Sequence, residues 1–404
     1  MTPTISIIIV THNSAVQIGA CLRALQQQRC DAEYEIVVVD NASRDESRAI
    51  VAGFPAARLV AEAENWGFAG GVNRGVATAH GRMIALLNPD AEPAPDWLQQ
   101  LIAALDDPRI GVVGSKVLGH DRRIQSLGSS LQLPVLLSAY RGAGQPDTTE
   151  PGAIVDVWAV HGAAMAFARP VWEVLGGFDE GFFPAYWEES DFCERARQAG
   201  YRVVVAPQAV VLHHEASATG KYSPEFYFYY HRNRLRYAAK WLDWPMLWGT
   251  FRPAEHARLR TAPLLDRRVA REAYHAGVPP LGRPDAQARA ATLATGQALR
   301  SGMLPDDGFE PLMQLIGEAD ANAVLEEVRF QSHLPLVARL RAAWNDVATR
   351  WYVRPSLDQQ TRFNLATERA LAALAEQTTA RSAADALDIA LLAWAVRRLE
   401  SLKV

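Results

Sequence analysis

The sequence contains few cysteines, three among 404 residues. Cys21, Cys30 and Cys193 lack the spacing of metal ligands, and their odd number cannot be accounted for by disulfides alone. Intracellular proteins keep their thiols reduced, whereas secreted proteins pair them. We therefore expect reduced thiols in a cytoplasmic protein.

Long apolar runs are also missing, since none approaches the roughly 20 residues that a membrane-spanning helix needs. The N-terminus has no basic segment followed by a long apolar run, so we expect no secretory signal. Contact with a membrane should be peripheral, at the inner face of the cell membrane. The formal net charge of -4 provides no general basic field, which argues against a nucleic-acid partner.

The glycine fingerprint of dinucleotide-binding domains does not follow the first predicted strand, which argues against a nicotinamide oxidoreductase. What the chain does have is an alternation of β-branched runs and helical periodicity. Such alternation predicts an α/β fold with a doubly wound sheet. The expected strands are Ile7–Val10, Ile36–Val39, Leu59–Val60, Met83–Leu87 and Ile110–Val113, and the expected helices are Ser14–Gln28, Asp45–Ala52, Gly70–Ala79 and Asp96–Leu105.

Polar clusters follow three of these strands, at the sheet edge where ligands bind in α/β proteins. Asp40 could accept hydrogen bonds from a nucleobase or a ribose, although Ser43 close by would also suit a helix N-cap. Asn88 and Asp90 follow a later strand and suit a hard divalent cation. The same Asn-Pro-Asp sequence is also ordinary turn chemistry.

A glycine-dense segment, residues 65–75, enters a predicted helix. Its glycines would let backbone N–H groups approach phosphates at the helix N-terminus. The alternative is a turn with a tightly packed helix.

Residues 177–195 place six carboxylates among aromatic side chains. Carboxylates held against apolar walls have a raised proton affinity, which suits a general base. The alternative is an acidic loop that leads into a solvated helix. His213 and His214 follow the next strand, and adjacent strand residues point to opposite faces, so at most one of them faces the site.

Taken in order, eight segments resemble the inverting glycosyltransferases of family 2, which have the GT-A fold. They are IIIVTHN, VVVDNASRD, ENWGFAGGVNRG, LLNPDAEP, HGAAMAFAR, GGFDEGFF, YWEESDFCERARQAGY and VVVAPQAVVLHH, and they cover roughly residues 4–240. The nearest subgroup is similar to rhamnosyltransferase-like enzymes that build bacterial surface polysaccharides. The resemblance therefore implies a GT-A catalytic domain over residues 1–245.

The resemblance also implies site residues. Nucleoside and donor contacts fall on Thr11, Asn13, Asp40, Asn65, Gly67, Phe68, Asn73 and Asn88. Asp90 would bind Mg²⁺ or Mn²⁺; because Asn88 replaces the usual first Asp, metal binding would be weaker or depend on His213. The general base falls on Glu189, with Glu188 and Asp191 as alternatives.

The implied reaction is a single displacement at the anomeric carbon of a dTDP- or UDP-sugar by a hydroxyl of a glycan or lipid-linked acceptor. A catalytically inactive, glycosyltransferase-like scaffold is the rival interpretation, since Asn88 and Glu189 depart from the family pattern. A glycoside hydrolase would also use two carboxylates, but it leaves the nucleoside-type strand ends unexplained.

The remaining segments lie outside the predicted site. Residues 226–248 interleave aromatic and basic side chains, which suits an anionic membrane surface or a helix packed on the catalytic domain. Residues 246–295 should be a linker or helical connector. Residues 296–404 should form a C-terminal helical domain that could support a homodimer.

Overall fold

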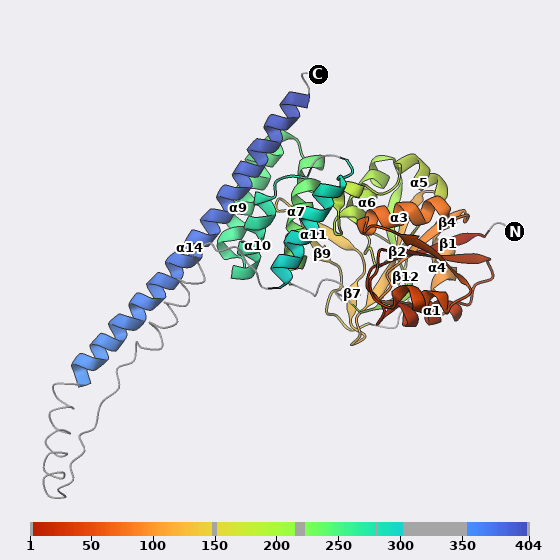
Figure 1. Ribbon diagram of the computed structural model, residues 1–404, viewed down its shortest axis with the longest axis horizontal. Coiled ribbons are helices and arrows are strands. Elements are labelled where there is room, and N and C mark those ends of the chain that lie inside the picture. Colours follow the sequence, from red (N-terminus) through yellow and green to blue (C-terminus); the bar gives the residue numbers. More distant parts are fainter. Residues whose placement is uncertain (1–2, 148–151, 215–222, 280–281, 302–353, 402–404) are drawn as a thin grey trace, which may run out of the picture.

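The computed structural model describes residues 3–147, 152–214, 223–279, 282–301 and 354–401. An α/β domain contains the N-terminal half, and helices extend from it on one side (Figure 1). The predicted α/β class, with a doubly wound mixed sheet and an added C-terminal helical region, is confirmed.

A ten-stranded mixed sheet forms the centre of the described α/β domain. Its main path runs β10-β12-β6-β11-β4-β1-β2-β3, with β5 paired to β12 and β7 paired to β6. A separate hairpin joins β8 and β9. The strands are β1 Ile5–Thr11, β2 Tyr34–Asn41, β3 Ala57–Glu62, β4 Met83–Leu87, β5 Ala91–Pro93, β6 Ile110–Leu118, β7 Ile124–Ser126, β8 Ser129–Gln132, β9 Leu137–Tyr140, β10 Val155–Asp156, β11 Ala164–Ala168 and β12 Arg202–His213.

The parallel centre of the sheet is built by the predicted β-branched runs. Strands β4, β1, β2 and β3 are parallel neighbours, and β11 enters antiparallel between β4 and β6. Strands β1, β2, β4 and β11 are buried on both faces, as continuous apolar runs require, whereas β3 at the sheet edge is partly exposed. The register pairs Thr11 with Asp40, so the polar ends of β1 and β2 lie side by side.

Helices cover both faces of the sheet (Figure 1). One face packs against α1 Ile18–Gln26, α2 Ser47–Ala52 and α4 Trp97–Leu105. The other packs against α3 Gly67–Thr78, α5 Arg169–Leu175 and α6 Glu188–Gln198. In α1 the buried residues Ile18, Cys21, Leu22 and Leu25 recur three or four positions apart, which gives that helix its single apolar face.

A second body of helices follows the sheet. It consists of α7 Pro224–Trp241, α8 Trp244–Met246, the π-helical turn η2 Leu247–Phe251, α9 Arg252–Thr261, α10 Leu264–His275, α11 Ala286–Arg300 and α14 Arg354–Ser401. Arg234 and Arg236 of α7 are fully buried and paired with carboxylates. The aromatic-basic segment is therefore a helix packed within the protein, which confirms that interpretation of it.

A buried ion cluster joins α7, α9 and α10. Glu255 of α9 has no exposed surface, and its Oε1 lies 2.5 Å from Arg234 Nη2 and 2.8 Å from Arg258 Nη2. The hydroxyl of Tyr274 on α10 donates to the same oxygen. Because each charge has an opposite partner, burial of the cluster is tolerated, and it fixes how these three helices pack.

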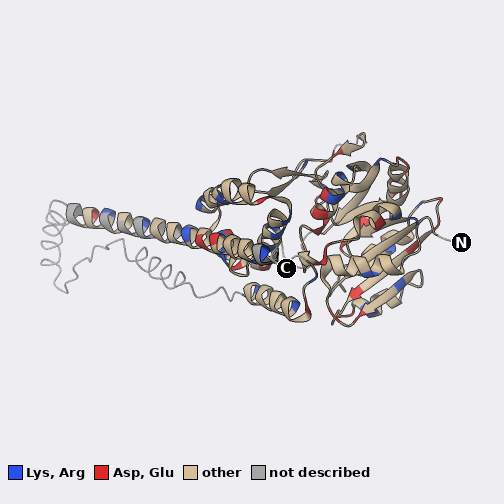
Figure 2. Ribbon diagram, turned by 90° about the horizontal axis from the view of Figure 1, so that it is seen from above, with Lys and Arg blue, Asp and Glu red and all other residues tan. Residues whose placement is uncertain are grey.

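Helix α14 packs on α9 and α10 through part of its length (Figure 1). Its apolar residues Leu387, Leu391 and Trp394, spaced three or four positions apart, are buried in this contact. Acidic and basic side chains are interspersed along the helix (Figure 2). Nowhere in the described ranges does a helix combine the length and apolar character needed to cross a bilayer.

The division into residues 1–245, 246–295 and 296–404 stays a prediction. Residues 246–275 form helices that pack against α7 and α14, and α11 spans the expected boundary at residue 295. Most of residues 296–353 lie outside the described part of the chain.

Candidate active site

A large cavity of about 1970 Å³ lies at the carboxyl ends of β1, β2 and β4. Its other walls come from the end of β12, the start of α6, and helices α7 and α11. Ligand pockets are typically about 300–1,000 Å³, so this volume leaves room for two substrates. The predicted site residues that line it are Asn13, Asn65, Gly67, Phe68, Asn88, Asp90, Glu188, Glu189 and His213.

The loops after β1 and β2 are bonded to each other at the cavity edge. The backbone N–H of Asn13 donates to Ser43 Oγ (2.9 Å), and Asn13 Oδ1 accepts from the N–H of Arg44 (2.8 Å). Asn13 adopts φ of 53°, a left-handed conformation that asparagine tolerates better than most residues. The N-cap interpretation of Ser43 is wrong, since α2 begins only at Ser47 and the Ser43 hydroxyl serves this loop contact instead.

Thr11 and Asp40 lie behind the cavity wall rather than in it. Both are fully buried. Strand alternation turns them toward α1 and α2, whereas the next residue, Asn41, points toward α3 and donates from Nδ2 to the carbonyl of Gly67 (2.8 Å). Among the described residues, Thr11 Oγ1 and Asp40 Oδ1 have no hydrogen-bond partner. Ligand contact by either residue stays a prediction.

Gly67 stands where the chain enters α3, and only glycine fits there. Its φ is +70°, and an added Cβ would lie 2.6 Å from the carbonyl oxygen of Pro184. Its N–H donates to Asn65 Oδ1 (2.8 Å), and the N–H of Phe68 donates to Pro184 O (2.7 Å). Because both N–H groups are used within the protein, the structure favours tight packing over a phosphate cradle at this helix end.

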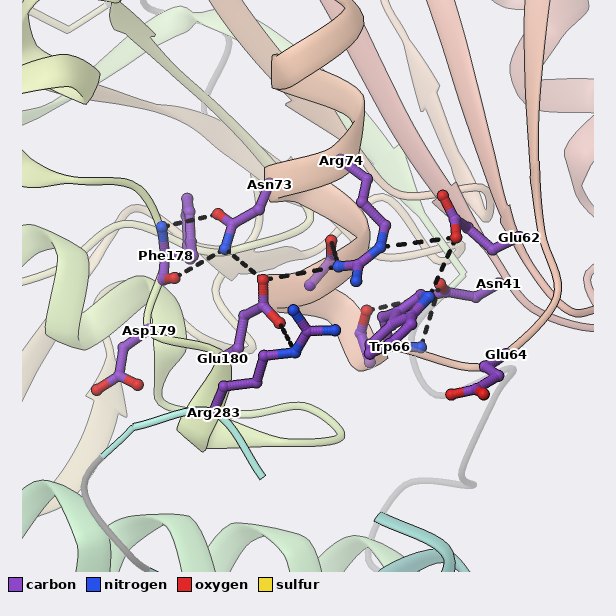
Figure 3. Close-up of polar contacts among 12 residues, drawn as sticks. Asn41, Glu62, Glu64, Trp66, Asn73, Arg74, Phe178, Asp179, Glu180 and Arg283 are labelled. Carbon is purple, nitrogen blue, oxygen red and sulfur yellow. Dashed lines mark hydrogen bonds and ion pairs between the residues drawn. The ribbon is translucent and has the colours of Figure 1, made fainter. Parts of the chain in front are cut away.

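Asn73, a predicted donor contact, is not among the cavity-lining residues. Figure 3 shows it between α3 and the loop that precedes α6. Its Nδ2 donates to Phe178 O (3.0 Å) and Glu180 Oε1 (3.1 Å), and its Oδ1 accepts from the N–H of Phe178 (3.0 Å). These contacts hold that loop against the helix, and donor contact by Asn73 stays a prediction.

Trp66 lies at the centre of a cluster that anchors the segment leading into α11 (Figure 3). The guanidinium carbons of Arg74, Arg283 and Arg289 lie 3.8, 4.2 and 4.1 Å from its ring centroid. Arg283 also pairs with Glu180 (3.1 Å), as Arg289 does with Glu64 (2.6 Å). This contact could not be predicted from the sequence, because it joins Trp66 to arginines more than 200 positions away that belong to no motif.

Asp90 and His213 meet at the centre of the cavity. Asp90 Oδ1 lies 3.3 Å from His213 Nε2, and both residues are almost fully buried. His214 points away and places its Nε2 2.9 Å from Glu92 Oε1. As strand alternation predicts, only one of the two adjacent histidines faces the cavity.

The Asp90–His213 pair fits part of a divalent-cation site. Neighbouring ligands of an octahedral Mg²⁺ with bonds of about 2.1 Å lie about 3 Å apart, close to the spacing seen here. Over the described ranges, no three His, Cys, Asp or Glu side chains gather as a complete metal site. Such a pair suits a cation that also takes oxygens from a substrate, as Mg²⁺ does with phosphates.

Glu188 and Glu189 begin α6 at the cavity wall. Burial raises the pKa of Glu189 to about 7. Burial and the neighbouring charge of Glu189 raise the pKa of Glu188 well above its ordinary value. Glu188 Oε2 has no hydrogen-bond partner within the described structure. A carboxylate with a pKa near neutrality matches the requirement for a general base.

Asp191, the other predicted alternative base, lies outside the cavity lining. It is fully buried, and its carboxylate is held by Arg195 (2.9 Å), Lys240 (2.7 Å) and the indole N–H of Trp241 (3.1 Å). The contacts with Lys240 and Trp241 tie α6 to α7, whereas Arg195 lies on α6 itself. Of the three predicted bases, the structure thus brings only Glu188 and Glu189 to the cavity.

Aromatic side chains form the far end of the cavity. Phe226 and Tyr230 of α7 are stacked, with centroids 5.6 Å apart, and Tyr186 lies edge-on to Phe226 (5.1 Å). Helix α11, which packs on α7, also contributes apolar and polar side chains to the lining: Ala290, Leu293, Ala294, Gln297 and Arg300. No motif in the sequence pointed to these α11 residues.

Residues 6–143 match the family model described as Glycosyl transferase family 2. This match lies within the α/β domain described above. Together with the mixed sheet, it agrees with the GT-A fold that the resemblance implies.

This chain covers different shares of the length of the curated relatives that it matches. An uncharacterized protein of Sinorhizobium fredii is 28% identical over 54% of this chain, which spans only 25% of that protein. The N-acetylglucosaminyl-diphospho-decaprenol L-rhamnosyltransferase of Mycobacterium tuberculosis is 25% identical over 65% of this chain and 95% of its own length. A solved mannosyltransferase from Pyrobaculum calidifontis has a TM-score of 0.45 at 23% identity, covering 75% of this chain and 84% of that one.

Proposed function

Because residues 6–143 form a family 2 glycosyltransferase domain, we propose that this protein transfers one sugar from a nucleotide-sugar donor to an acceptor hydroxyl, with inversion of configuration. The observation that carries the proposal is that Glu189 and the Asp90–His213 pair line the same cavity. A base on one side and a diphosphate-binding pair on the other are the two elements that a single displacement needs.

Glu189 is the proposed general base. Its ionised carboxylate takes the proton of the acceptor hydroxyl as that oxygen attacks the anomeric carbon, and the bond to the nucleoside diphosphate breaks in the same step. Asp90 and His213 would hold Mg²⁺ or Mn²⁺, which neutralises charge on the diphosphate oxygens when bound. We assign the nucleoside to the region of the cavity that Asn13 and the loop after β2 border.

The donor that we favour is a dTDP-sugar of the rhamnosyl type, with UDP-sugars as the alternative. Support comes from the mycobacterial relative, whose name describes an L-rhamnosyltransferase and whose length this chain almost covers. At 25% identity the name is a guide to the first substrates to test.

We assign the acceptor to the aromatic end of the cavity, between α7 and α11. Sugar rings present apolar C–H faces that pack on aromatic rings, and Tyr186, Phe226 and Tyr230 provide such faces. Leu293 of α11 lines the same cavity. A glycan acceptor, either free or lipid-linked, fits this mixture of aromatic and polar lining.

The direct test is calorimetric titration with dTDP, UDP and GDP, with and without Mn²⁺, on the wild type and on Asp90→Ala. We expect one nucleotide to bind in a metal-dependent manner and the variant to lose that dependence. Transfer from the matching nucleotide sugar is then followed by NMR, and the anomeric configuration of the product reports inversion. If none of the three nucleotides binds, the proposed donor site is wrong, and the proposed transfer reaction is wrong with it.

The inactive scaffold remains the second candidate because Asn88 and Glu189 differ from the family pattern. It predicts that a nucleotide binds while neither transfer nor donor hydrolysis occurs with any common nucleotide sugar. The raised pKa of Glu189 weighs against the scaffold interpretation. A buried carboxylate with only a structural role would be stabilised by a neighbouring cation, which would lower its pKa.

A further inference from the structure

The side-chain amide of Gln125 makes two hydrogen bonds with His213. This glutamine belongs to the short strand β7, which carried no recognisable signal in the sequence. Its Nε2 donates to the backbone carbonyl of His213 (2.9 Å), and its Oε1 lies 3.0 Å from the Nδ1 of the same residue. Both residues line the cavity.

The two contacts together determine the tautomer of His213. A backbone carbonyl can only accept a hydrogen bond, so the NH₂ end of the Gln125 amide must face it. The Oε1 end, which also can only accept, then faces Nδ1, so Nδ1 must carry the proton. In the neutral ring, Nε2 therefore presents a lone pair toward Asp90 Oδ1, 3.3 Å away.

In that arrangement the lone pair of His213 Nε2 faces the carboxylate oxygen Oδ1 of Asp90, and both residues are buried. Without Gln125, the neutral ring could switch tautomer, and Nε2–H would donate to Asp90. A closed hydrogen bond of that kind would occupy both atoms that we assign to the cation. In the neutral ring, the amide of Gln125 prevents this closure by holding the proton at Nδ1.

We infer that Gln125 is a positioning residue that keeps His213 Nε2 open to a divalent cation. The inference rests on the proposed function, because it assigns the cation to the Asp90–His213 pair. Groups that orient a metal-bound histidine typically change metal affinity by about 10–100-fold when they are removed. Gln125 itself stays outside the reaction and acts only through His213.

Two other histidines at the cavity provide internal references. His12 Nδ1 lies 2.7 Å from the carbonyl of Asn41, which requires Nδ1–H in the neutral ring, as for His213. His161 Nδ1 lies 3.1 Å from the N–H of Ala163 and must accept, so its proton is on Nε2. The structure thus predicts opposite tautomers for His213 and His161, whose ring centroids are only 5.4 Å apart.

The experiment uses the full chain with ¹⁵N-labelled histidine and records long-range ¹H–¹⁵N correlation spectra. The sample contains no metal, and its pH is high enough for the histidine rings to be neutral. We expect Nδ1–H for His213 and Nε2–H for His161. Gln125→Met keeps the length of the side chain but removes both contacts, so His213 should shift toward Nε2–H while His12 and His161 stay unchanged. Gln132→Met, on β8, is the matched control and should leave all three tautomers as they are.

A second measurement records Mn²⁺ binding by electron paramagnetic resonance, in the presence of UDP or dTDP. Gln125→Met should weaken Mn²⁺ binding about 10–100-fold, and Gln132→Met should not. Nε2–H at His213 in the wild type, or unchanged tautomer and affinity in Gln125→Met, would overturn the inference. If the wild type binds no Mn²⁺ while the predicted tautomers are present, the metal part of the proposed function fails instead.

Discussion

Arg48 Nε lies 2.5 Å from Asp40 Oδ2, so the carboxylate that ends β2 is already paired within the protein. Asp40 has no exposed surface, whereas 42% of the Arg48 side chain is exposed and lines the cavity. A ligand entering from the cavity would therefore meet the guanidinium first. Arg48 also donates from Nη2 to the carbonyl of Glu62 (2.9 Å), which fixes its position between β2 and β3.

We predict that Asp40 supports nucleotide binding mainly by orienting Arg48. Asp40→Asn and Arg48→Met should each weaken nucleotide binding about tenfold or more, because a hydrogen bond to a charged group contributes about 1.5–3 kcal/mol. The double variant should be little worse than either single one, which a double-mutant cycle measured by calorimetry would show. Weaker binding in Asp40→Asn with normal binding in Arg48→Met would instead favour direct contact by Asp40.

Glu189→Gln should lower the transfer rate by about 10²–10⁴-fold, the usual contribution of a general base. Nucleotide affinity should stay unchanged, because this carboxylate does not lie at the nucleoside side. The base must be ionised, so the wild-type rate should rise with pH and level off above about 7, where the pKa of Glu189 lies. The variant should lose that rise, and a profile that keeps it would move the assignment to Glu188.

Glu255→Gln should lower the free energy of unfolding of the helical body by about 3–5 kcal/mol, because it leaves buried Arg234 without its carboxylate partner and Arg258 with Asp266 alone. Urea denaturation of the full chain measures this change. Asp107→Asn is the control, because the Asp107–Arg109 pair is at the surface and should contribute nothing measurable.

The same residue gives a pH dependence of stability. Burial opposes the charge of Glu255, but Arg234 and Arg258 outweigh it and lower the pKa to about 2. A carboxyl group whose pKa is lower in the folded state than in the unfolded state stabilises the fold. This stabilisation is fully present when the pH is above the pKa of the unfolded state, 4.5. This stabilisation should be lost as the pH falls from about 4.5 toward 2, and the difference between wild type and Glu255→Gln should shrink over that range.

Leu293→Trp should obstruct the acceptor end of the cavity without touching the donor end. We expect a higher KM for the acceptor, while nucleotide binding and slow hydrolysis of the donor by water continue. Ala288→Trp, on the same helix but outside the cavity lining, is the control. Equal loss of donor binding in Leu293→Trp would show that both substrates occupy one end of the cavity.

The parallel core and its helices could be predicted from the sequence because each depends on local periodicity. The runs at Ile7–Val10 and Met83–Leu87 and the spacing within α1 all lie within one element. Strand-end residues such as Asp90 could also be located, because chain order places them at one sheet edge. Short strands such as β7 leave too few residues for a period to be recognised.

Contacts between distant segments could not be predicted. Asn73 and Asp191 have the residue types of a binding site, yet tertiary packing uses their polar atoms to hold loops and helices together. Gln125 and the α11 lining have no motif, and they reach the cavity only because β7 lies beside β6 and because α11 is anchored at Trp66. Side-chain partners of this kind are set by the assembled fold rather than by spacing along the chain.

The long helix α14 has a practical use. Its 48 residues rise about 1.5 Å each and so extend about 70 Å, while its described buried side chains lie between Thr379 and Trp394. Its opening turns reach well past the packed helices (Figure 1). A fluorophore attached through Asp358→Cys would sit far from the cavity, so surface tethering or single-molecule tracking could proceed without obstructing substrates.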